Sequence, residues 1–582
     1  MREILTFFTI LIFSFDQVKS QELSHMLAPE GFETRAHQER VYVHHNSAVI
    51  FPGEYFLYSV YNLNSKTGKL SDLSKIAYVE LIGENSEVVF RQKVMLEGGR
   101  GYADYFIPTS VPSGNYKLVA YTNWMRNLED NYFESDIVLI NPYQSNQKQL
   151  LKTGINTNSE VHLKGRERTE NAPAEGLLPL SLNKNTFKKR DQVKINTGNT
   201  SGEVMNGTYS LSVRKLETLS FNPKKTANSN GSKNEELFIA KENKLKLPEL
   251  RGQIVAGRLT SGANITPGKR IVALSIPSEE GFTNLVETNK EGQFFFNVET
   301  DIRNRNAVLE IIGSGGDEFK IELDRQEGID PSGLQFSEFT LTPEMEDIIL
   351  QRSIYNQIEN AFFSVKPDTL VPPEKESGLP EKMMETYQLS DYTRFKSVPE
   401  TFVEIIKSAG VRKNAEGQAV FQVRGLNNYV EMGLLPLVMI DGIMVQDHSI
   451  PAGMDARRLK SVKIIRDKIF LGPASFQGAV IFETLDNDYF DEHSAPNVRK
   501  VELFTSEVPK KYFQQVYTEK NRNNRVPDFR YQLYWNPNLD LKSSGEAIEF
   551  FTSDVEGDFE VVLEGFTAEG KPVSLREYFR VE

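Results

Sequence analysis

Short stretches in which apolar and polar residues alternate, separated by turn residues, cover most of residues 39–142. Residues 55–61 and 116–121 are two of them. A period of two is the pattern of half-buried strands, and short strands at close spacing are typical of antiparallel sandwiches. Similar patterns return after residue 178. We therefore predict a mainly β, multidomain protein with several antiparallel β-sandwiches, a short helical brace and one α+β domain.

The patterning also divides the chain into units. We predict β-sandwiches at residues 21–143, 178–245, 246–328 and 491–582. Residues 144–177 are polar and hold few large apolar side chains. The burial of so little apolar surface cannot offset the conformational entropy lost on ordering. We therefore interpret that stretch as a linker.

A helical pattern occupies residues 342–362, within a connector that spans 329–399. Thr342 is the expected cap, and Pro343 is suited to the first helical position. The apolar residues recur at helical spacing, and they are Met345, Ile348, Ile349, Ile354, Tyr355 and Ile358. We interpret this helix as a structural brace.

Two families are similar to parts of the predicted sandwiches. Residues 41–45, 51–54 and 113–127 resemble a macroglobulin-type domain of bacterial envelope proteins, and 178–245 looks like a second such domain. In 246–328, a glycine turn precedes an aromatic strand, as in carboxypeptidase-regulatory-like sandwiches. The resemblance implies folds that carry no catalysis by themselves.

Residues 400–490 contain an ordered series of segments that resembles the plug domain of TonB-dependent receptors. The segments are 400–407, 421–425, 437–445, 459–467 and 478–482. The combination resembles a Bacteroidota-type envelope protein with an orphan plug-like α+β domain. Because a receptor barrel needs about 22 strands and 93 residues follow Tyr489, we expect no barrel from this chain itself.

The plug resemblance points to a set of partner-binding residues. They are Arg424, Gly425, Asp441, Gly442, Gly472 and Gly478. By resemblance, they belong to a docking surface for a barrel wall or a TonB-like partner. The alternative is structural: glycines with positive φ, an aspartate that caps a turn, and an arginine at the surface. The structural interpretation is favoured, and both remain open.

Composition limits where the protein is expected to be located and which sites and partners it can have. Residues 1–20 read as a secretory signal peptide, and no second apolar run is long enough to span a bilayer, so we expect an exported protein in the periplasm, associated with the outer membrane, or at the cell surface. The chain has no cysteine, which excludes disulfides, thiolate zinc sites, a lipoprotein anchor and the macroglobulin thioester. A net charge of −13 argues against nucleic acid as a partner.

Catalytic, metal and cofactor sites find little support. No G-x-S-x-G or H-E-x-x-H pattern occurs, and residues 262–270 depart from a phosphate loop in spacing and at the magnesium-binding position. His44 and His45 are adjacent on a predicted strand, so one ring is expected in the core and one in solvent. Calcium at the run of Asp486, Asp488, Asp491 and Glu492 is a weaker alternative to a solvated turn. We predict no catalytic residue, metal or cofactor.

The sequence predicts a non-catalytic binding or scaffold protein of the cell envelope. Its expected partner is an outer-membrane β-barrel protein, to which it would be an accessory subunit of a transporter or translocon. One alternative is macroglobulin-like protease control, with a bait stretch at residues 153–176. The other is a surface adhesin or glycan-binding protein, although two tryptophans are few for stacking on sugars.

Overall fold

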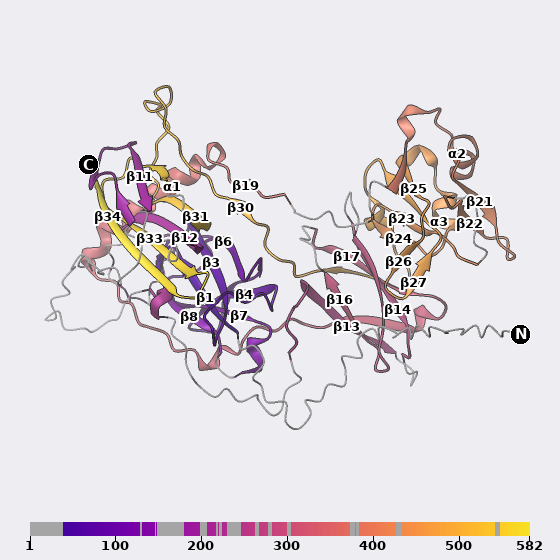
Figure 1. Cartoon of the computed structure of the whole chain (residues 1–582), viewed down its shortest axis with the longest axis horizontal. Helices are drawn as coiled ribbons and strands as arrows, with labels where there is room; N and C mark the ends of the chain where they lie inside the picture. The colour runs from indigo at the N-terminus through magenta and orange to yellow at the C-terminus, as the bar shows by residue number, and fades with distance from the viewer. Residues whose placement is uncertain are drawn as a thin grey trace, which may run out of the picture.

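The computed structural model describes residues 39–582, except for gaps at 129–130, 146, 148–149, 151–179, 198–205, 217–218, 220, 222–223, 230–245, 262–266, 278–281, 299–303, 373–378, 380–382, 427–432 and 542–546. The predicted signal peptide, the predicted bait stretch and most of the predicted linker therefore lie outside the described residues. The prediction of a mainly β, multidomain protein is confirmed. Two lobes are visible, one built from both ends of the chain and one from its middle (Figure 1).

The N-terminal sandwich is the first half of the first lobe. A three-stranded sheet faces a five-stranded sheet across a core that is almost wholly apolar and aromatic. The smaller sheet has the order β1 (Glu39–His45), β3 (Tyr55–Asn64), β6 (Arg100–Phe106). The larger has the order β2 (Val49–Ile50), β8 (Phe133–Leu139), β7 (Gly114–Thr122), β4 (Ile76–Gly83), β5 (Val88–Met95).

The second sandwich combines segments that the sequence pattern had assigned to two separate domains. Its larger sheet has the order β10 (Thr186–Phe187), β34 (Pro572–Val581), β33 (Gly557–Thr567), β12 (Gly207–Lys215), β31 (Gln532–Leu541). Its smaller sheet has the order β32 (Ile548–Phe551), β11 (Gln192–Thr197), β9 (Leu180–Leu182). The division at 178–245 and 491–582 therefore differs from the structure, because alternation identifies strands but carries no information on which distant strand each one pairs with.

The two sandwiches of the first lobe share a buried polar contact surface. Tyr42 donates its hydroxyl to Glu564 at 3.0 Å, and the Nδ1 of His44 lies 2.6 Å from the Oγ of Ser210. The expectation that one ring of the histidine pair faces solvent is wrong, since both are buried. The second sandwich packs on the face of the β1–β3–β6 sheet that carries His44, so this face is not exposed to solvent. Burial lowers the pKa of His44 well below its usual value and that of His45 to about 3.

A third sandwich forms the inner part of the second lobe. One sheet has the order β16 (Gln293–Val298), β13 (Gln253–Ser261), β18 (Phe319–Leu323). The other has the order β15 (Phe282–Glu287), β14 (Ile271–Ile276), β17 (Asn306–Ile312), β29 (Val498–Glu502). The predicted turn is present before the aromatic strand β16: Gly292 has φ +75°, and Asn289 Oδ1 accepts from the backbone N–H groups of Glu291 and Gln293.

The predicted helix is present as α1 (Glu346–Ala361), preceded by a 3₁₀ turn at Pro343–Met345. Part of the expected apolar stripe does pack inward, since Met345, Ile348, Ile349 and Tyr355 contribute to apolar clusters. The same helix also buries three polar side chains, Arg352, Ser353 and Asn356, which lie near Glu54, a buried carboxylate of the N-terminal sandwich that α1 covers. Arg352 donates to both oxygens of Glu54, at 2.7 and 2.8 Å.

The plug-like unit is an α+β domain at the outer end of the second lobe (Figure 1). Its sheet has the order β20 (Met384–Gln388), β25 (Leu459–Ile465), β28 (Ala479–Thr484), β23 (Leu437–Ile440), β24 (Ile443–Met444). Two hairpins and three short helices complete it: β21 (Ala409–Lys413) with β22 (Ala419–Val423), β26 (Ile469–Leu471) with β27 (Ala474–Phe476), α2 (Val398–Glu404), α3 (Ser449–Gly453) and α4 (Tyr489–Glu492). None of the described helices is long and apolar enough to cross a membrane.

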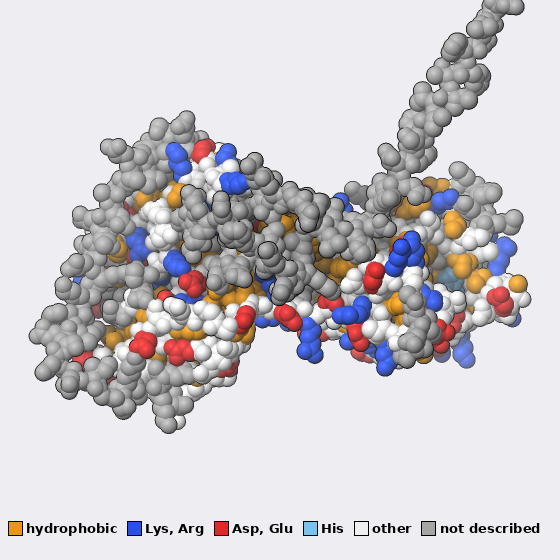
Figure 2. All heavy atoms as spheres, turned by 90° about the horizontal axis from the view of Figure 1, so that it is seen from below, with side chains coloured by type: hydrophobic (Ala, Val, Ile, Leu, Met, Phe, Trp, Pro, Cys, Tyr) orange, Lys and Arg blue, Asp and Glu red, His pale blue; other side chains and the backbone are white. Residues whose placement is uncertain are grey.

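The chain passes repeatedly between the two lobes. Along the sequence, the plug-like unit lies between β18 and β29, so the last strand of the third sandwich follows the whole unit. Between the lobes, β19 (Thr369–Leu370) pairs with β30 (Lys510–Lys511), which joins one outgoing and one returning segment (Figure 1). On the face in Figure 2, basic and acidic side chains are interspersed over the described surface, so the negative net charge is not gathered into one patch there.

Candidate binding site at the plug-like unit

Asp441 and Gly442 form the two-residue turn between β23 and β24. Both have positive φ, +49° and +80°, which is the geometry that Asp-Gly adopts in a type I′ hairpin. The buried carboxylate of Asp441 accepts from the backbone N–H and the hydroxyl of Thr484, both at 2.7 Å, and from the N–H of Tyr489 at 3.2 Å. The aspartate therefore ties this turn to the end of β28 and the start of α4.

Arg424 and Gly425 lie at the opposite end of the sheet from Asp441. Their backbone carbonyls accept hydrogen bonds from the guanidinium of Arg466, at 2.9 and 2.7 Å, while the side chain of Arg424 is exposed. Leu437 pairs with Ala479 at this end, and Ile440 precedes Asp441 at the other. The structure therefore does not bring Arg424 and Asp441 into one site.

Gly472 and Gly478 both occupy positions where a side chain would collide with backbone. Gly478 has φ +75°, and an added Cβ would lie 2.2 Å from the carbonyl oxygen of Ile465. Gly472 has φ +51°, and its Cβ would lie 1.8 Å from the carbonyl oxygen of Leu285 on β15. Gly472 thus allows the β26–β27 hairpin to touch the third sandwich.

The plug-like sheet is covered on both faces by other parts of this chain. One face packs on α2, α3 and the β21–β22 hairpin. The other face packs on β14 and β15 of the third sandwich through a second apolar cluster, whose buried members are Ala273, Leu285, Leu437, Met439, Met444, Ile465, Ile469 and Ala479. Hydrogen bonds from Met444 N–H to Ser275 Oγ (3.2 Å) and from Thr283 Oγ1 to the Gly442 carbonyl (3.3 Å) fix the contact.

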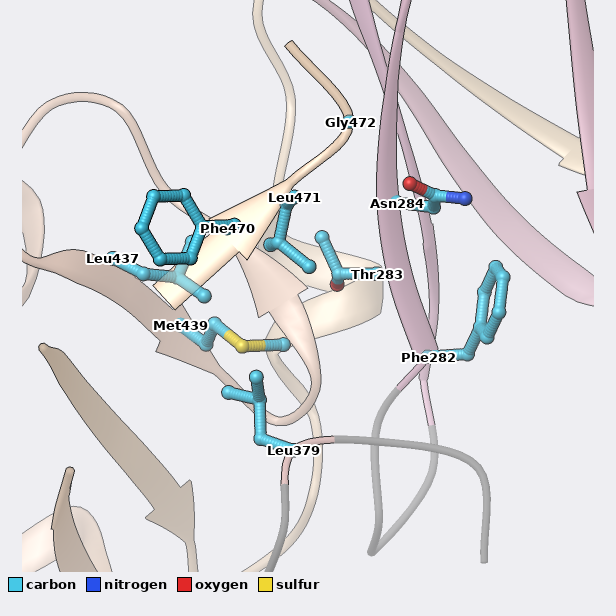
Figure 3. Close-up of a pocket in the computed structure, with 9 residues that line it drawn as sticks. All are labelled: Phe282, Thr283, Asn284, Leu379, Leu437, Met439, Phe470, Leu471 and Gly472. Carbon is cyan, nitrogen blue, oxygen red and sulfur yellow. The ribbon is translucent and has the colours of Figure 1, made fainter. Parts of the chain in front are cut away.

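A cavity of about 250 Å³ opens at the junction of the plug-like unit and the third sandwich. Figure 3 shows β15 on one side of it and the β26–β27 hairpin on the other. The lining residues are Phe282, Thr283, Asn284, Leu379, Leu437, Met439, Phe470, Leu471 and Gly472. The side chain of Phe470 is 71% exposed. Six of the nine lining residues have hydrophobic side chains, but the accessible lining is about as polar as it is apolar. None of the nine is charged, so the cavity is suited to an uncharged side chain rather than to a charged ligand.

Sequence reasoning found Gly472 but missed this cavity. Its walls come from segments almost two hundred residues apart, and neither segment carries a pattern that indicates a site. A single signal was available: Phe470 stands between the apolar residues Ile469 and Leu471, and in a strand one of these three must face away from the core.

Glu310 is a buried carboxyl group at the same junction. Its Oε1 accepts from Gln446 and, at 3.3 Å, from Asn497, while its Oε2 is buried without a hydrogen-bond partner. Burial raises the pKa of Glu310 to about 7, against the two hydrogen bonds that lower it. The folded junction therefore stabilises the protonated, neutral form of Glu310 relative to the carboxylate.

We expect the second lobe to lose stability as the pH rises through about 7. A folded pKa above the unfolded one gives a contribution that is complete below the unfolded value, near 4.5, and is lost above the folded one, by about 1.4 kcal/mol per pKa unit. Glu310→Gln keeps the acceptor and does not titrate. Denaturant unfolding of both proteins between about pH 4 and pH 8, a range that brackets the unfolded and folded pKa values, checks this, and an unchanged difference across that range contradicts it.

The sequence offered two further candidate sites, a calcium site in the acidic run and a phosphate loop. Arg458 contacts Asp488 at 3.0 Å and Glu492 at 2.8 Å, so a guanidinium already pairs with two of the four carboxylates of the acidic run. Among the described residues, no group of three or more histidine, cysteine or acidic side chains could hold a metal ion. Residues 262–266 of the phosphate-loop candidate lie outside the described residues.

Comparison with known proteins gives structural similarity only. No protein-family model matches the chain, and no curated protein matches it. The structure of an Escherichia coli alpha-2-macroglobulin activated by porcine elastase is 9% identical and covers 94% of this chain and 44% of its own, with a TM-score of 0.24. A Salmonella alpha-2-macroglobulin reacted with methylamine is 10% identical and covers 93% of this chain and 39% of its own, with a TM-score of 0.23.

The native conformation of the E. coli protein gives a similar result, with 10% identity, coverage of 94% and 40%, and a TM-score of 0.24. This chain thus spans about two fifths of the length of these structures. Because the TM-scores lie far below 0.5, the matches carry no argument about function.

Proposed function

We propose that this chain is a non-catalytic binding protein of the cell envelope, and that its second lobe docks on an outer-membrane β-barrel protein as an accessory subunit of a transporter or translocon. The observation that supports it is the uncharged cavity beside the exposed Phe470. An exposed aromatic side chain next to a cavity that can accept a side chain of a partner is the arrangement of a protein-binding hot spot.

The packing of the plug-like unit limits how it can dock. A plug inside a barrel is surrounded by the barrel wall, whereas here one sheet face is held on the third sandwich by eight buried apolar residues. Insertion would expose that cluster, at a cost of about 25 cal/mol for each Å² of apolar surface. The partner therefore reaches the unit from outside, at the rim where the cavity opens.

The size of the cavity favours a protein over a small molecule as its occupant. Drug-sized ligands occupy pockets of about 300 to 1,000 Å³, and this cavity is smaller, at about 250 Å³. It is large enough for one apolar anchor side chain from a partner, with Phe470 packing against the same partner. The proposal thus assigns the contact to a loop of the barrel protein that presents an apolar residue.

Purification from the native envelope tests the proposal. We expect the tagged protein, extracted in mild detergent, to recover a stoichiometric barrel protein, and we expect Phe470→Asp to reduce that recovery at least tenfold, since loss of a hot spot costs about 2 kcal/mol or more. Quantitative mass spectrometry of the co-purifying proteins is the measurement.

The control is Val403→Asp, which alters an 81% exposed apolar residue on α2 of the same unit, outside the cavity lining. This variant is expected to recover as much partner as the unaltered protein. Recovery of the protein alone would overturn the proposal, and an equal loss in both variants would move the contact away from the cavity. Protease control depends on residues 153–176, which lie outside the described residues.

A further inference from the structure

The helix α1 buries polar side chains on its inner side and exposes apolar ones on its outer side. Arg352 is fully buried, and Ser353 and Asn356 are buried beside it. On the outer side, Leu350 is 58% exposed and Ile354 is 45% exposed. A surface helix normally buries its apolar side and exposes its polar one. Here Ile348, Ile349 and Tyr355 pack in apolar clusters, and Leu350 and Ile354 are further apolar residues that stay exposed.

The outward apolar residues form a continuous surface. Leu350, Ile354, Ile358 and Phe362 follow one another at intervals of four residues, and we call these four the α1 stripe. Side chains four apart on a helix are neighbours, about 5 to 6 Å between their Cβ atoms. Phe362 is 36% exposed and Ile358 is half-buried. A row of this kind marks an interaction surface, whereas a single exposed leucine does not.

The charges around the α1 stripe indicate what kind of partner it fits. Glu344, Glu346 and Asp347 are all exposed at the N-terminal end of α1. Toward the other end, Lys366 is buried and contacts Glu359 at 2.7 Å and Asp528 at 3.5 Å. The N-terminal end of the α1 stripe is therefore acidic, which favours a partner with cationic side chains at that end and opposes an anionic membrane surface.

We propose that the α1 stripe docks an amphipathic helix of a protein partner, whose apolar face is flanked by lysine or arginine. Helix-on-helix packing uses apolar residues at spacings of three and four, and the α1 stripe offers that spacing. The surface lies on the first lobe, so it does not depend on the cavity of the second lobe.

The probe is a synthetic amphipathic peptide of about 16 residues, the length of α1, with a leucine face flanked by lysines and a span of about 24 Å. Isothermal titration calorimetry with the full chain is expected to show binding, and Leu350→Gln with Ile354→Gln is expected to weaken it at least tenfold. A peptide with glutamate in place of lysine is expected to bind at least tenfold more weakly.

Glutamine is a good helix former, and both replaced side chains are largely exposed, so the double variant is expected to fold; circular dichroism verifies this. Val403→Gln on α2 is the control and leaves binding unchanged. Three results would overturn the proposal: equal binding of the two peptides, no effect of the double variant, or no binding at all. Stripe-dependent binding to anionic phospholipid vesicles, or a dimer that the double variant abolishes in ultracentrifugation, would overturn it in favour of a membrane or a second copy.

Discussion

Glu54→Gln is expected to unfold the first lobe at a much lower denaturant concentration than the unaltered protein. Glu54 is 8% exposed and accepts hydrogen bonds from Arg352, from Arg214 at 3.0 Å and from Asn356 at 2.9 Å. Burial alone would raise its pKa, but the two guanidinium groups hold the pKa at about 2. Removing one partner of a buried ion pair leaves an uncompensated charge, so we expect a loss of about 3 to 5 kcal/mol.

The measurement can be confined to the first lobe. Both tryptophans of the chain, Trp124 and Trp535, lie there, so intrinsic fluorescence during urea unfolding reports on this lobe. Glu549→Gln is the matched control, because Glu549 pairs with Lys194 at 2.6 Å with both side chains more than 40% exposed, and such a pair contributes about 1 kcal/mol or less. Equal losses in the two variants would contradict the assigned role of Glu54.

Gly472→Ala is expected to separate the plug-like unit from the third sandwich. The new Cβ would lie 1.8 Å from the carbonyl oxygen of Leu285, and the φ of +51° is unfavourable for alanine. Left-handed backbone costs about 1 to 2 kcal/mol, and overpacking costs about 1 to 3 kcal/mol more. Faster hydrogen exchange in β15 and in the β26–β27 hairpin is the measurement.

Gly417→Ala is the control that separates the cost of left-handed backbone from the cost of overpacking. Gly417 has φ +81° at the tip of the β21–β22 hairpin, with nothing within 4 Å of an added Cβ. It is expected to show only the cost of left-handed backbone, about 1 to 2 kcal/mol, and no change in β15. If Gly472→Ala were no worse than this control, the close contact with Leu285 would not be a determinant of the junction.

Local features of the fold were predictable from the sequence, and long-range ones were not. The Asn289–Gly292 turn follows from residue types at neighbouring positions and is present where expected. Thr342 and Pro343 stand at the start of the 3₁₀ turn before α1, but the hydroxyl of Thr342 makes no capping hydrogen bond. The pairing of β12 with β33 joins Ser210 to the region of Glu564, 354 residues further along. Nothing in the alternation of either strand specifies that partner, so two half-sandwiches appeared as two domains.

The same distinction applies to the candidate sites. The Asp441-Gly442 turn carries its own local signal, whereas the burial of His44 depends on a sheet contributed from elsewhere in the chain. The inward side of α1 was predicted only in part, for a related reason. Helical spacing identified apolar residues that do pack inward, but the burial of Arg352 depends on Glu54, a buried acid almost three hundred residues earlier in the chain.

The split of the second sandwich across the chain also sets an order in which the protein can fold. A chain that emerges N-terminus first presents β12 long before β31 and β33, its neighbours on both sides, have been synthesised. Unpaired strand edges are prone to aggregation, so β12 is a point of vulnerability during synthesis. The second lobe needs nothing beyond β29 to complete its sheets, and a chain truncated after residue 502 would keep those sheets while leaving β12 without either neighbour.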